Sequence, residues 1–222
     1  MQPTFAVIFD MDGVIVDSNP YHAQAWIQFC KDYNVPLNED EIPKLIYGKT
    51  NKVALKEVFK KDFSPEEADR LGEEKEAIYR ELHQKDMEPV KGLIPFLRML
   101  KQNNIATAVA TNAPVSNLNF TLERINIRQY FDKLIDATMV KEGKPDPDIY
   151  LKAAEKLNMA PEKCIVMEDS IPGVEAGLRA NMKVVALTTT HSREELAHTH
   201  LVIEDFEDLT LDKLMSLLNE NK

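Results

Sequence analysis

Phe5-Ala6-Val7-Ile8-Phe9-Asp10-Met11-Asp12-Gly13-Val14 is the stretch of sequence from which the fold can be inferred. Its first five residues form a continuous apolar run, which is typical of a strand buried on both faces. Asp10 ends the run, and Asp12 lies two residues further on, so in an extended chain both carboxylates point to the same side. Such a pair is compatible with a metal site, an acid/base pair or both, because a divalent cation offsets the repulsion between carboxylates. It is equally compatible with a solvated turn, since Asp and Gly are common turn residues.

Short apolar runs of the same kind recur along the chain and alternate with helical patterns. Leu93, Phe96, Leu97 and Leu100, for example, have the i, i+3, i+4, i+7 spacing of one helix face. The further strand candidates are residues 105–110, 134–137, 165–167, 184–187 and 201–203. This alternation predicts an α/β fold, a Rossmann-like three-layer sandwich with a parallel sheet between helices. Ligands of such folds bind at the carboxyl ends of the strands.

Residues 17–88 break the alternation, because they contain helical patterns and no strand-like run. Asn19-Pro20 is typical of a helix start, with an N-cap followed by a proline. We therefore predict a small all-helical domain over residues 17–88. It is inserted into a core domain made of residues 1–16 and 89–222.

The longest helical pattern of this insertion begins at Ser64. Glu67 follows three residues later, and this capping-box spacing predicts a helix that runs through Leu82. Acidic and basic residues alternate between Glu66 and Glu81, and we expect them on the solvent-facing side of the helix.

Composition limits the classes of partner and the location. The 222 residues include 27 Lys and Arg against 37 Asp and Glu, which gives a net charge of −10. This charge disfavours binding to nucleic acids and to anionic membranes. The N-terminal apolar run is cut off by Asp10 and has no basic flank, so we expect neither a signal peptide nor a membrane span, and a cytoplasmic location. The oligomeric state is not readable from the sequence, and a monomer is compatible with it.

Residues 9–18, Phe-Asp-Met-Asp-Gly-Val-Ile-Val-Asp-Ser, closely resemble the first motif of the haloacid dehalogenase-like superfamily, in its phosphatase and phosphoglucomutase branch. The other three motifs of that family are matched in order, each at the end of an expected strand or in a loop. They are Thr111-Asn112-Ala113, Lys144-Pro145 and Glu168-Asp169-Ser170. The resemblance therefore covers essentially the whole chain.

The resemblance implies a mechanism and a cofactor. Asp10 is implied as the nucleophile that forms an aspartyl-phosphate, and Asp12 as the general acid and base. A Mg²⁺ ion is implied as well, since it prefers oxygen ligands and shields the nucleophile from an incoming anion. Its implied ligands are Asp10, the backbone carbonyl of Asp12, Glu168 and Asp169. The implied phosphate-binding residues are Thr111, Asn112, Ala113 and Lys144.

Each of these residues also has a simpler interpretation when it is taken alone. Thr111 is then a hydroxyl at a strand end, and Lys144 is a surface lysine beside a proline. Glu168 and Asp169 are then acids at a helix start, attracted by the helix dipole. The functional interpretation depends on the four motifs occurring together.

The helical insertion resembles the small cap domain of the same branch. β-Phosphoglucomutases carry a lysine before a glycine in the cap loop and an arginine three residues after that glycine, which together hold the distal phosphate. The matching positions here are Tyr47 and Asn51, so both cations are replaced. Lys49 and Lys52 either compensate or are solvated. The substrate-binding candidates of the insertion are His22, Gly48, Lys49, Thr50 and Asn51, and His22 is alternatively an ordinary surface residue.

These observations favour a magnesium-dependent phosphatase that acts on a small phosphorylated metabolite. A β-phosphoglucomutase-like isomerase is the first alternative, and a catalytically silent binding module is a more remote one. A dehalogenase is disfavoured, because that branch lacks the second aspartate and Asp12 is present. The substrate stays open among sugar phosphates, nucleotides, phosphoglycolate and pyrophosphate.

Overall fold

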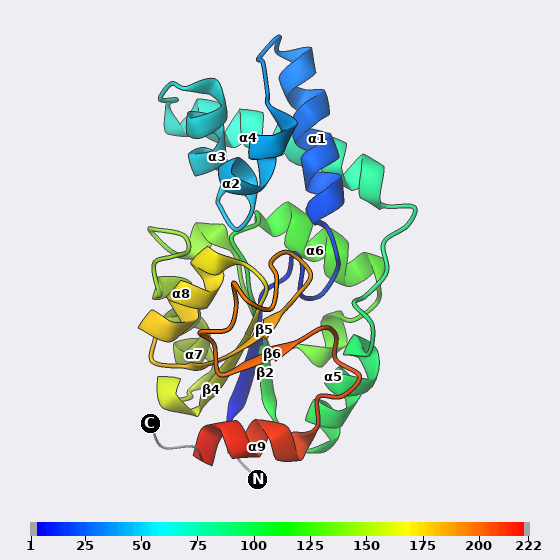
Figure 1. The fold of residues 1–222 in the computed structure, drawn as a ribbon, viewed down its shortest axis with the longest axis vertical. Helices are drawn as coiled ribbons and strands as arrows, with labels where there is room; N and C mark the ends of the chain where they lie inside the picture. Colours follow the sequence, from blue (N-terminus) through cyan, green and yellow to red (C-terminus); the bar gives the residue numbers. More distant parts are fainter. Residues whose placement is uncertain (1–3, 220–222) are drawn as a thin grey trace.

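A computed structural model describes residues 4–219, in which a parallel sheet is the central layer (Figure 1). Its strands lie in the order β3-β2-β1-β4-β5-β6, and all neighbours are parallel. The strands are β1 Ala6–Phe9, β2 Ala106–Ala110, β3 Lys133–Ile135, β4 Cys164–Glu168, β5 Lys183–Leu187 and β6 Leu201–Ile203. The predicted α/β fold with a parallel sheet is confirmed.

Helices cover both faces of the sheet, because neighbouring residues of each strand point to opposite sides. Val7 and Phe9 of β1 belong to one apolar cluster and Ala6 and Ile8 to another. Helices α5 Leu93–Gln102, α6 Val115–Arg124 and α9 Leu211–Asn219 contribute to the first cluster, and α7 Asp148–Leu157 and α8 Ile171–Arg179 to the second. Both faces of the sheet are therefore apolar, which agrees with strands that are continuous apolar runs.

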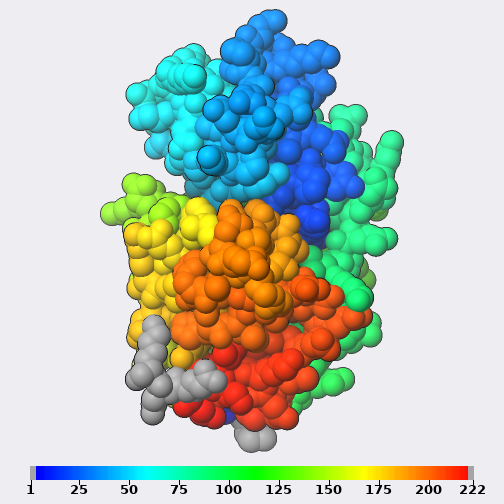
Figure 2. Space-filling model, viewed as in Figure 1, coloured from blue at the N-terminus to red at the C-terminus, as the bar shows by residue number. Residues whose placement is uncertain are grey.

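The remaining helices form a separate layer above the carboxyl edge of the sheet (Figure 1). They are α1 Asn19–Asp32, α2 Ile42–Ile46, α3 Asn51–Phe59 and α4 Pro65–His83. They have an apolar cluster of their own around Trp26, Phe29, Leu55 and Leu71. In Figure 2 the segment that carries these helices, coloured blue to cyan, lies at one end of the molecule, directly against the core.

The helix starts agree only in part with those predicted from the sequence. Ser64 caps α4 as predicted, and its Oγ accepts a hydrogen bond from the Glu67 amide at 3.2 Å. Asn19, however, does not cap α1, because Ser18 occupies that position and makes no side-chain cap bond. The Asn19 amide instead donates to Asp169 at 3.3 Å and to Thr190 at 2.6 Å. A residue that is typical of a helix cap is therefore used to join the insertion to the core.

The register of the sheet brings distant residues together at its carboxyl edge. Phe9 pairs with Met167, and the Asp10 amide donates to the Met167 carbonyl at 2.9 Å. Asp10 therefore lies beside Glu168, although 158 residues separate them in the chain. Gly13 allows the close turn after Asp10, since it has φ +77° and a Cβ there would lie 1.9 Å from Asp169 Oδ2.

Four short 3₁₀ segments complete the described elements, at Glu39–Glu41, Arg128–Tyr130, Ala137–Met139 and Pro161–Lys163. The predicted strand over residues 134–137 is shorter than expected, because Asp136 accepts a hydrogen bond from the Thr138 amide and starts the third of these segments. No helix within residues 4–219 is both long and apolar enough to cross a membrane.

Candidate active site

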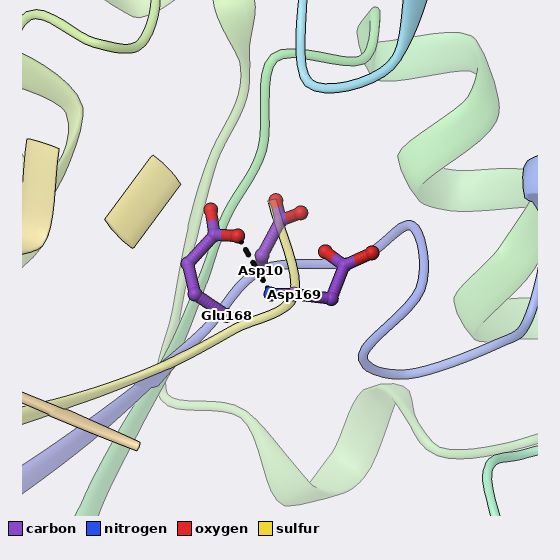
Figure 3. Close-up of side chains that lie close together, drawn as sticks. All are labelled: Asp10, Glu168 and Asp169. Carbon is purple, nitrogen blue, oxygen red and sulfur yellow. Dashed lines mark hydrogen bonds between the residues drawn. The ribbon is translucent and has the colours of Figure 1, made fainter. Parts of the chain in front are cut away.

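Three carboxylates converge where β1 and β4 end (Figure 3). Asp10, Glu168 and Asp169 each offer an oxygen within 4.8 Å of the others, and all three residues are buried. Neighbouring parallel strands end at the same edge, which explains why β1 and β4 deliver their acids to one place. This cluster is the centre of the candidate site.

Lys144 supplies positive charge to the cluster. Its Nζ lies 2.6 Å from Asp10 Oδ1 and 2.6 Å from Glu168 Oε1, and its side chain is buried. Asn112 fixes the backbone of the lysine, because Asn112 Oδ1 accepts from the Lys144 amide at 3.2 Å. The simple interpretation of Lys144 as a surface lysine is therefore wrong.

Glu168 and Asp169 have different surroundings, although they are adjacent in the chain. Glu168 Oε1 also accepts from Tyr150 at 2.8 Å, and Oε2 accepts from the amides of Asp169 and Ser170. Asp169 Oδ2 accepts from Asn19 and Thr190, whereas Asp169 Oδ1 is buried and has no hydrogen-bond partner among the described residues. Burial next to Glu168 and Asp10 raises the pKa of Asp169 well above its ordinary value.

A divalent cation fits this arrangement. The donors are carboxylate oxygens, which hard cations such as Mg²⁺ prefer. A buried carboxylate oxygen without a partner is costly, and a bound cation would satisfy it. Asp10 and Asp169 are better placed as direct ligands than Glu168, since both oxygens of Glu168 already accept hydrogen bonds. The Asp12 side chain does not belong to the cluster.

The pKa values of the two aspartates of the first motif are shifted in opposite directions. Burial raises the pKa of Asp10 to about 7, although the charge of Lys144 opposes the shift. Burial also acts on Asp12, but the charge of His22 and hydrogen bonds from His22 and Ser18 outweigh it and hold the pKa of Asp12 below its ordinary value. Carboxyl groups whose pKa values are pushed apart are typical of sites where the two have different roles.

His22 links Asp12 to the helical insertion. Its Nε2 lies 3.2 Å from Asp12 Oδ1, and the ring stacks on Tyr79 with the centroids 3.8 Å apart. Ser18 Oγ donates to the same Asp12 oxygen at 2.6 Å. His22 is therefore part of the site and not an ordinary surface residue.

The predicted phosphate-binding residues lie at the end of β2 and line the same cavity. Thr111 is buried, and its Oγ1 accepts from the Ala113 amide at 3.0 Å. Asn112 Nδ2 donates to the Gly48 carbonyl at 2.9 Å, so the core touches the loop of the insertion here. Thr111, Asn112 and Ala113 all line the cavity, together with Asp10 and Lys144.

The insertion covers this cavity and leaves it small. Its volume is about 60 Å³, which is room for a few water molecules. The walls come from both the core and the insertion.

The candidates in the loop of the insertion are only partly in the site. Lys49 lines the cavity, but its Nζ is bound to Glu57 and to the Lys44 carbonyl. Asn51 donates to Glu76 at 2.8 Å. Thr50 is not among the residues that line the cavity, and Lys52 is exposed and does not line it either. Lys49 is already paired and Lys52 lies outside the cavity lining, so neither lysine is placed to replace the missing cations of the mutase loop.

Two charged residues of α4 are in the site although the sequence placed them in solvent. Lys75 and Glu76 are only 2% and 3% exposed and line the cavity. The expectation of a solvent-facing charged surface is therefore wrong for these two. A signal was available, because Lys75 lies four residues after Leu71 and four before Tyr79, on the apolar side of the helix.

The Asp169→Asn variant is expected to change metal affinity and stability in opposite directions. The raised pKa of Asp169 means that its ionisation costs stability as the pH rises above the ordinary value of 3.8, so in metal-free protein asparagine removes this cost. We expect the Tm of the metal-free variant at pH 7 to equal or exceed that of wild type by roughly 2–4 °C. Calorimetry should show Mg²⁺ binding at least about tenfold weaker, a loss of about 1.4 kcal/mol. Unchanged Mg²⁺ affinity would remove Asp169 from the metal site.

The acids and the buried lysine lie at the carboxyl edge of a parallel sheet, and a helical insertion covers them. This arrangement is that of an α/β enzyme whose site lies between the core and the insertion. The chain belongs to the haloacid dehalogenase-like hydrolases, whose family model matches residues 7–187. This confirms the family that the four motifs indicated.

Individual relatives agree with this assignment. The chain is 36% identical to a phosphorylated carbohydrates phosphatase of Thermotoga maritima, over 80% of this chain and 82% of the relative. It is 31% identical to the β-phosphoglucomutase of Bacillus subtilis, over 94% of this chain and 93% of that relative. A crystal structure of a hydrolase of the same superfamily from Entamoeba histolytica is 33% identical and superimposes with a TM-score of 0.89, covering 97% of this chain and all of the other.

Proposed function

We propose that this enzyme is a Mg²⁺-dependent phosphatase that hydrolyses phosphate monoesters of small carbohydrates through an aspartyl-phosphate on Asp10. The observation that carries the proposal is the geometry around Asp10. Its buried carboxylate lies 2.6 Å from Lys144 and shares a cluster with the partly unpartnered Asp169. Lys144, and a divalent cation held by these carboxylates, would attract an anionic phosphoryl group to a nucleophile in an otherwise acidic protein.

The first half of the reaction transfers the phosphoryl group to the protein. An oxygen of Asp10 attacks phosphorus in line, and the bond from phosphorus to the sugar oxygen breaks. Asp12 donates its proton to that oxygen, so the sugar leaves as a neutral alcohol. Ser18 and His22, which contact Asp12, hold its carboxyl group toward the leaving oxygen.

The second half of the reaction regenerates the free carboxylate of Asp10. Asp12 is then ionised and takes a proton from a water molecule, whose oxygen attacks the phosphorus of the aspartyl-phosphate. The bond from phosphorus to Asp10 breaks, and inorganic phosphate leaves. The low pKa of Asp12 favours the ionised form that this step needs, whereas the proton transfer of the first half needs the protonated form.

The negative charge on the phosphoryl oxygens must be neutralised in both halves of the reaction. Thr111 and the backbone amide of Asn112 lie at the end of β2 and would donate to these oxygens, Ala113 lines the cavity beside them, and Lys144 adds a full charge. Asp10, Asp169, the Asp12 carbonyl and, less directly, Glu168 would hold Mg²⁺. When bound there, Mg²⁺ would supply positive charge that neutralises the phosphoryl group and the nucleophile.

The proposal that the substrate is a phosphorylated carbohydrate rests on the names of two similar proteins. Besides the Thermotoga phosphatase, a hexitol phosphatase of Escherichia coli is 30% identical over 93% of this chain and 93% of its own length. The assignment of residues 17–88 as a cap domain, a cytoplasmic location and the lack of nucleic-acid partners stay predictions. The similarity to a β-phosphoglucomutase keeps an isomerase as the second candidate.

Phosphate release with and without metal tests the proposal. We expect the purified enzyme to release phosphate from p-nitrophenyl phosphate and from a panel of sugar monophosphates in Mg²⁺. Chelation with EDTA should lower the rates by at least roughly a hundredfold, and added Mg²⁺ should restore them. The proposal would be contradicted if folded protein in Mg²⁺ released phosphate from none of the compounds in the panel.

A further inference from the structure

Two polar side chains outside the four motifs contact the carboxylate of Asp169. Asn19 is the first residue of α1, and Thr190 lies in the loop that follows β5. Asn19 Nδ2 donates to Asp169 Oδ2 at 3.3 Å and to Thr190 Oγ1 at 2.6 Å. Thr190 Oγ1 in turn donates to Asp169 Oδ2. The three side chains therefore form a closed triangle of hydrogen bonds that the proposed chemistry does not use.

The triangle treats the two oxygens of Asp169 differently. A side-chain amide has two hydrogens to donate and a hydroxyl has one, so Asn19 and Thr190 can make all three bonds at once. Both bonds to the carboxylate end on Oδ2. Oδ1 is left buried and without a hydrogen-bond partner among residues 4–219. The carboxylate thus has one oxygen that is held by the protein and one that is open to a cation.

The backbone that carries the two donors is itself held in place. Asn19 is only 8% exposed, and its carbonyl accepts from the Tyr47 hydroxyl at 3.3 Å. Beside Thr190, Thr189 Oγ1 donates to the carbonyl of Gly13 at 2.6 Å, in the turn that follows β1. The donors come from the start of the insertion and from the core, and each has further contacts. They therefore restrict the directions in which the carboxylate can point.

We infer that Asn19 and Thr190 are positioning residues of the metal centre, which hold Asp169 by Oδ2 so that Oδ1 stays available to the cation. This inference rests on the proposed Mg²⁺-dependent function and adds two residues to it. Hydrogen-bond partners behind a metal ligand orient that ligand, and their loss typically weakens metal binding by about 10–100-fold. Mg²⁺ gains most from a fixed ligand, because it requires nearly ideal octahedral geometry, whereas Ca²⁺ accepts irregular sites.

Calorimetric titration of substrate-free protein with Mg²⁺ tests the role of Thr190 without any turnover. Thr190→Val keeps the branched shape and removes the hydroxyl, so the Kd for Mg²⁺ should rise at least about tenfold. The rise in the Kd for Ca²⁺ should be smaller, by a factor of roughly three or more. Thr190→Ser retains the hydroxyl and should bind Mg²⁺ within about twofold of wild type. A role confined to folding would not separate the two cations.

Thr188→Val is the matched control. It makes the same change two residues earlier, at a hydroxyl that donates to the Ile203 carbonyl of β6 rather than to a carboxylate. Its Kd for Mg²⁺ should equal that of wild type. Asn19→Ala removes the other donor from a different element and should raise the Kd at least about threefold, so the inference can be tested even with a Thr190→Val protein that does not fold. Thermal unfolding curves identify the folded variants.

The outcomes separate this inference from the proposed function. Wild-type Mg²⁺ affinity in folded Asn19→Ala and Thr190→Val would overturn the positioning role, and so would equal losses for Mg²⁺ and Ca²⁺ that Thr190→Ser does not restore. An enzyme that binds Mg²⁺ and releases phosphate, but whose Kd ignores both changes, would contradict only the roles of Asn19 and Thr190. Wild-type protein that binds no Mg²⁺ would contradict the metal-dependent function as well.

Discussion

The Asp10→Asn variant is expected to lose at least roughly a thousandfold in the rate of phosphate release, equivalent to about 4 kcal/mol of barrier. Asparagine keeps the shape of the side chain and removes the attacking charge, so no aspartyl-phosphate can form. Folding should be preserved, because the change relieves a buried carboxylate whose pKa is raised to about 7 by burial. The measurement is a steady-state assay with p-nitrophenyl phosphate, alongside a thermal unfolding curve.

Asp17→Asn serves as the control for this variant. Asp17 is an exposed residue of the same segment and lies outside the cavity lining. Its variant should keep wild-type activity. If Asp10→Asn retained more than a tenth of the wild-type rate, Asp10 would not be the nucleophile.

The second large effect concerns the fate of the phosphoryl group. With β-glucose 1-phosphate we expect net release of phosphate, no need for a sugar bisphosphate activator and negligible formation of glucose 6-phosphate. A mutase must hold a bisphosphate intermediate in two orientations, which requires cations away from the metal. Asn51 and the paired Lys49 do not provide them. Loss of two charge-assisted contacts weakens binding by on the order of a hundredfold or more.

A coupled dehydrogenase assay for glucose 6-phosphate, run beside a phosphate assay, measures both fates. A ratio of phosphate release to isomerisation well above one is the expected result. Isomerisation that outpaces phosphate release would make the enzyme a mutase, with Lys49 or Lys75 holding the distal phosphate.

Much of the fold was predictable because its strands are buried on both faces. Residues 5–9 and 165–167 are continuous apolar runs that need a covered sheet, and the structure places them side by side as β1 and β4. Element ends were less predictable. Asn19 has the chemistry of a helix cap, but its amide is used by Asp169, 150 residues away, which local sequence does not reveal.

The core of the candidate site was predictable for a different reason. Asp10, Thr111, Lys144 and Asp169 were singled out by the resemblance of four motifs to the superfamily, and their positions at strand ends or in loops agree with it, because parallel strands bring such positions to one edge. Lys75 and Glu76 were missed because charged residues on a helix are usually solvated. Only tertiary packing of α4 against α1 and the core makes them part of the cavity.

A rapid-quench experiment with ³²P-labelled fructose 1-phosphate and Mg²⁺ tests the central claim most directly. It follows the label from the sugar to the protein and then to the solvent. We predict that label appears first on Asp10, as located by peptide mapping of acid-quenched protein, and afterwards in inorganic phosphate. Phosphate release without labelled protein at any time, or label that returns to an isomeric sugar phosphate, would contradict a phosphatase that works through Asp10.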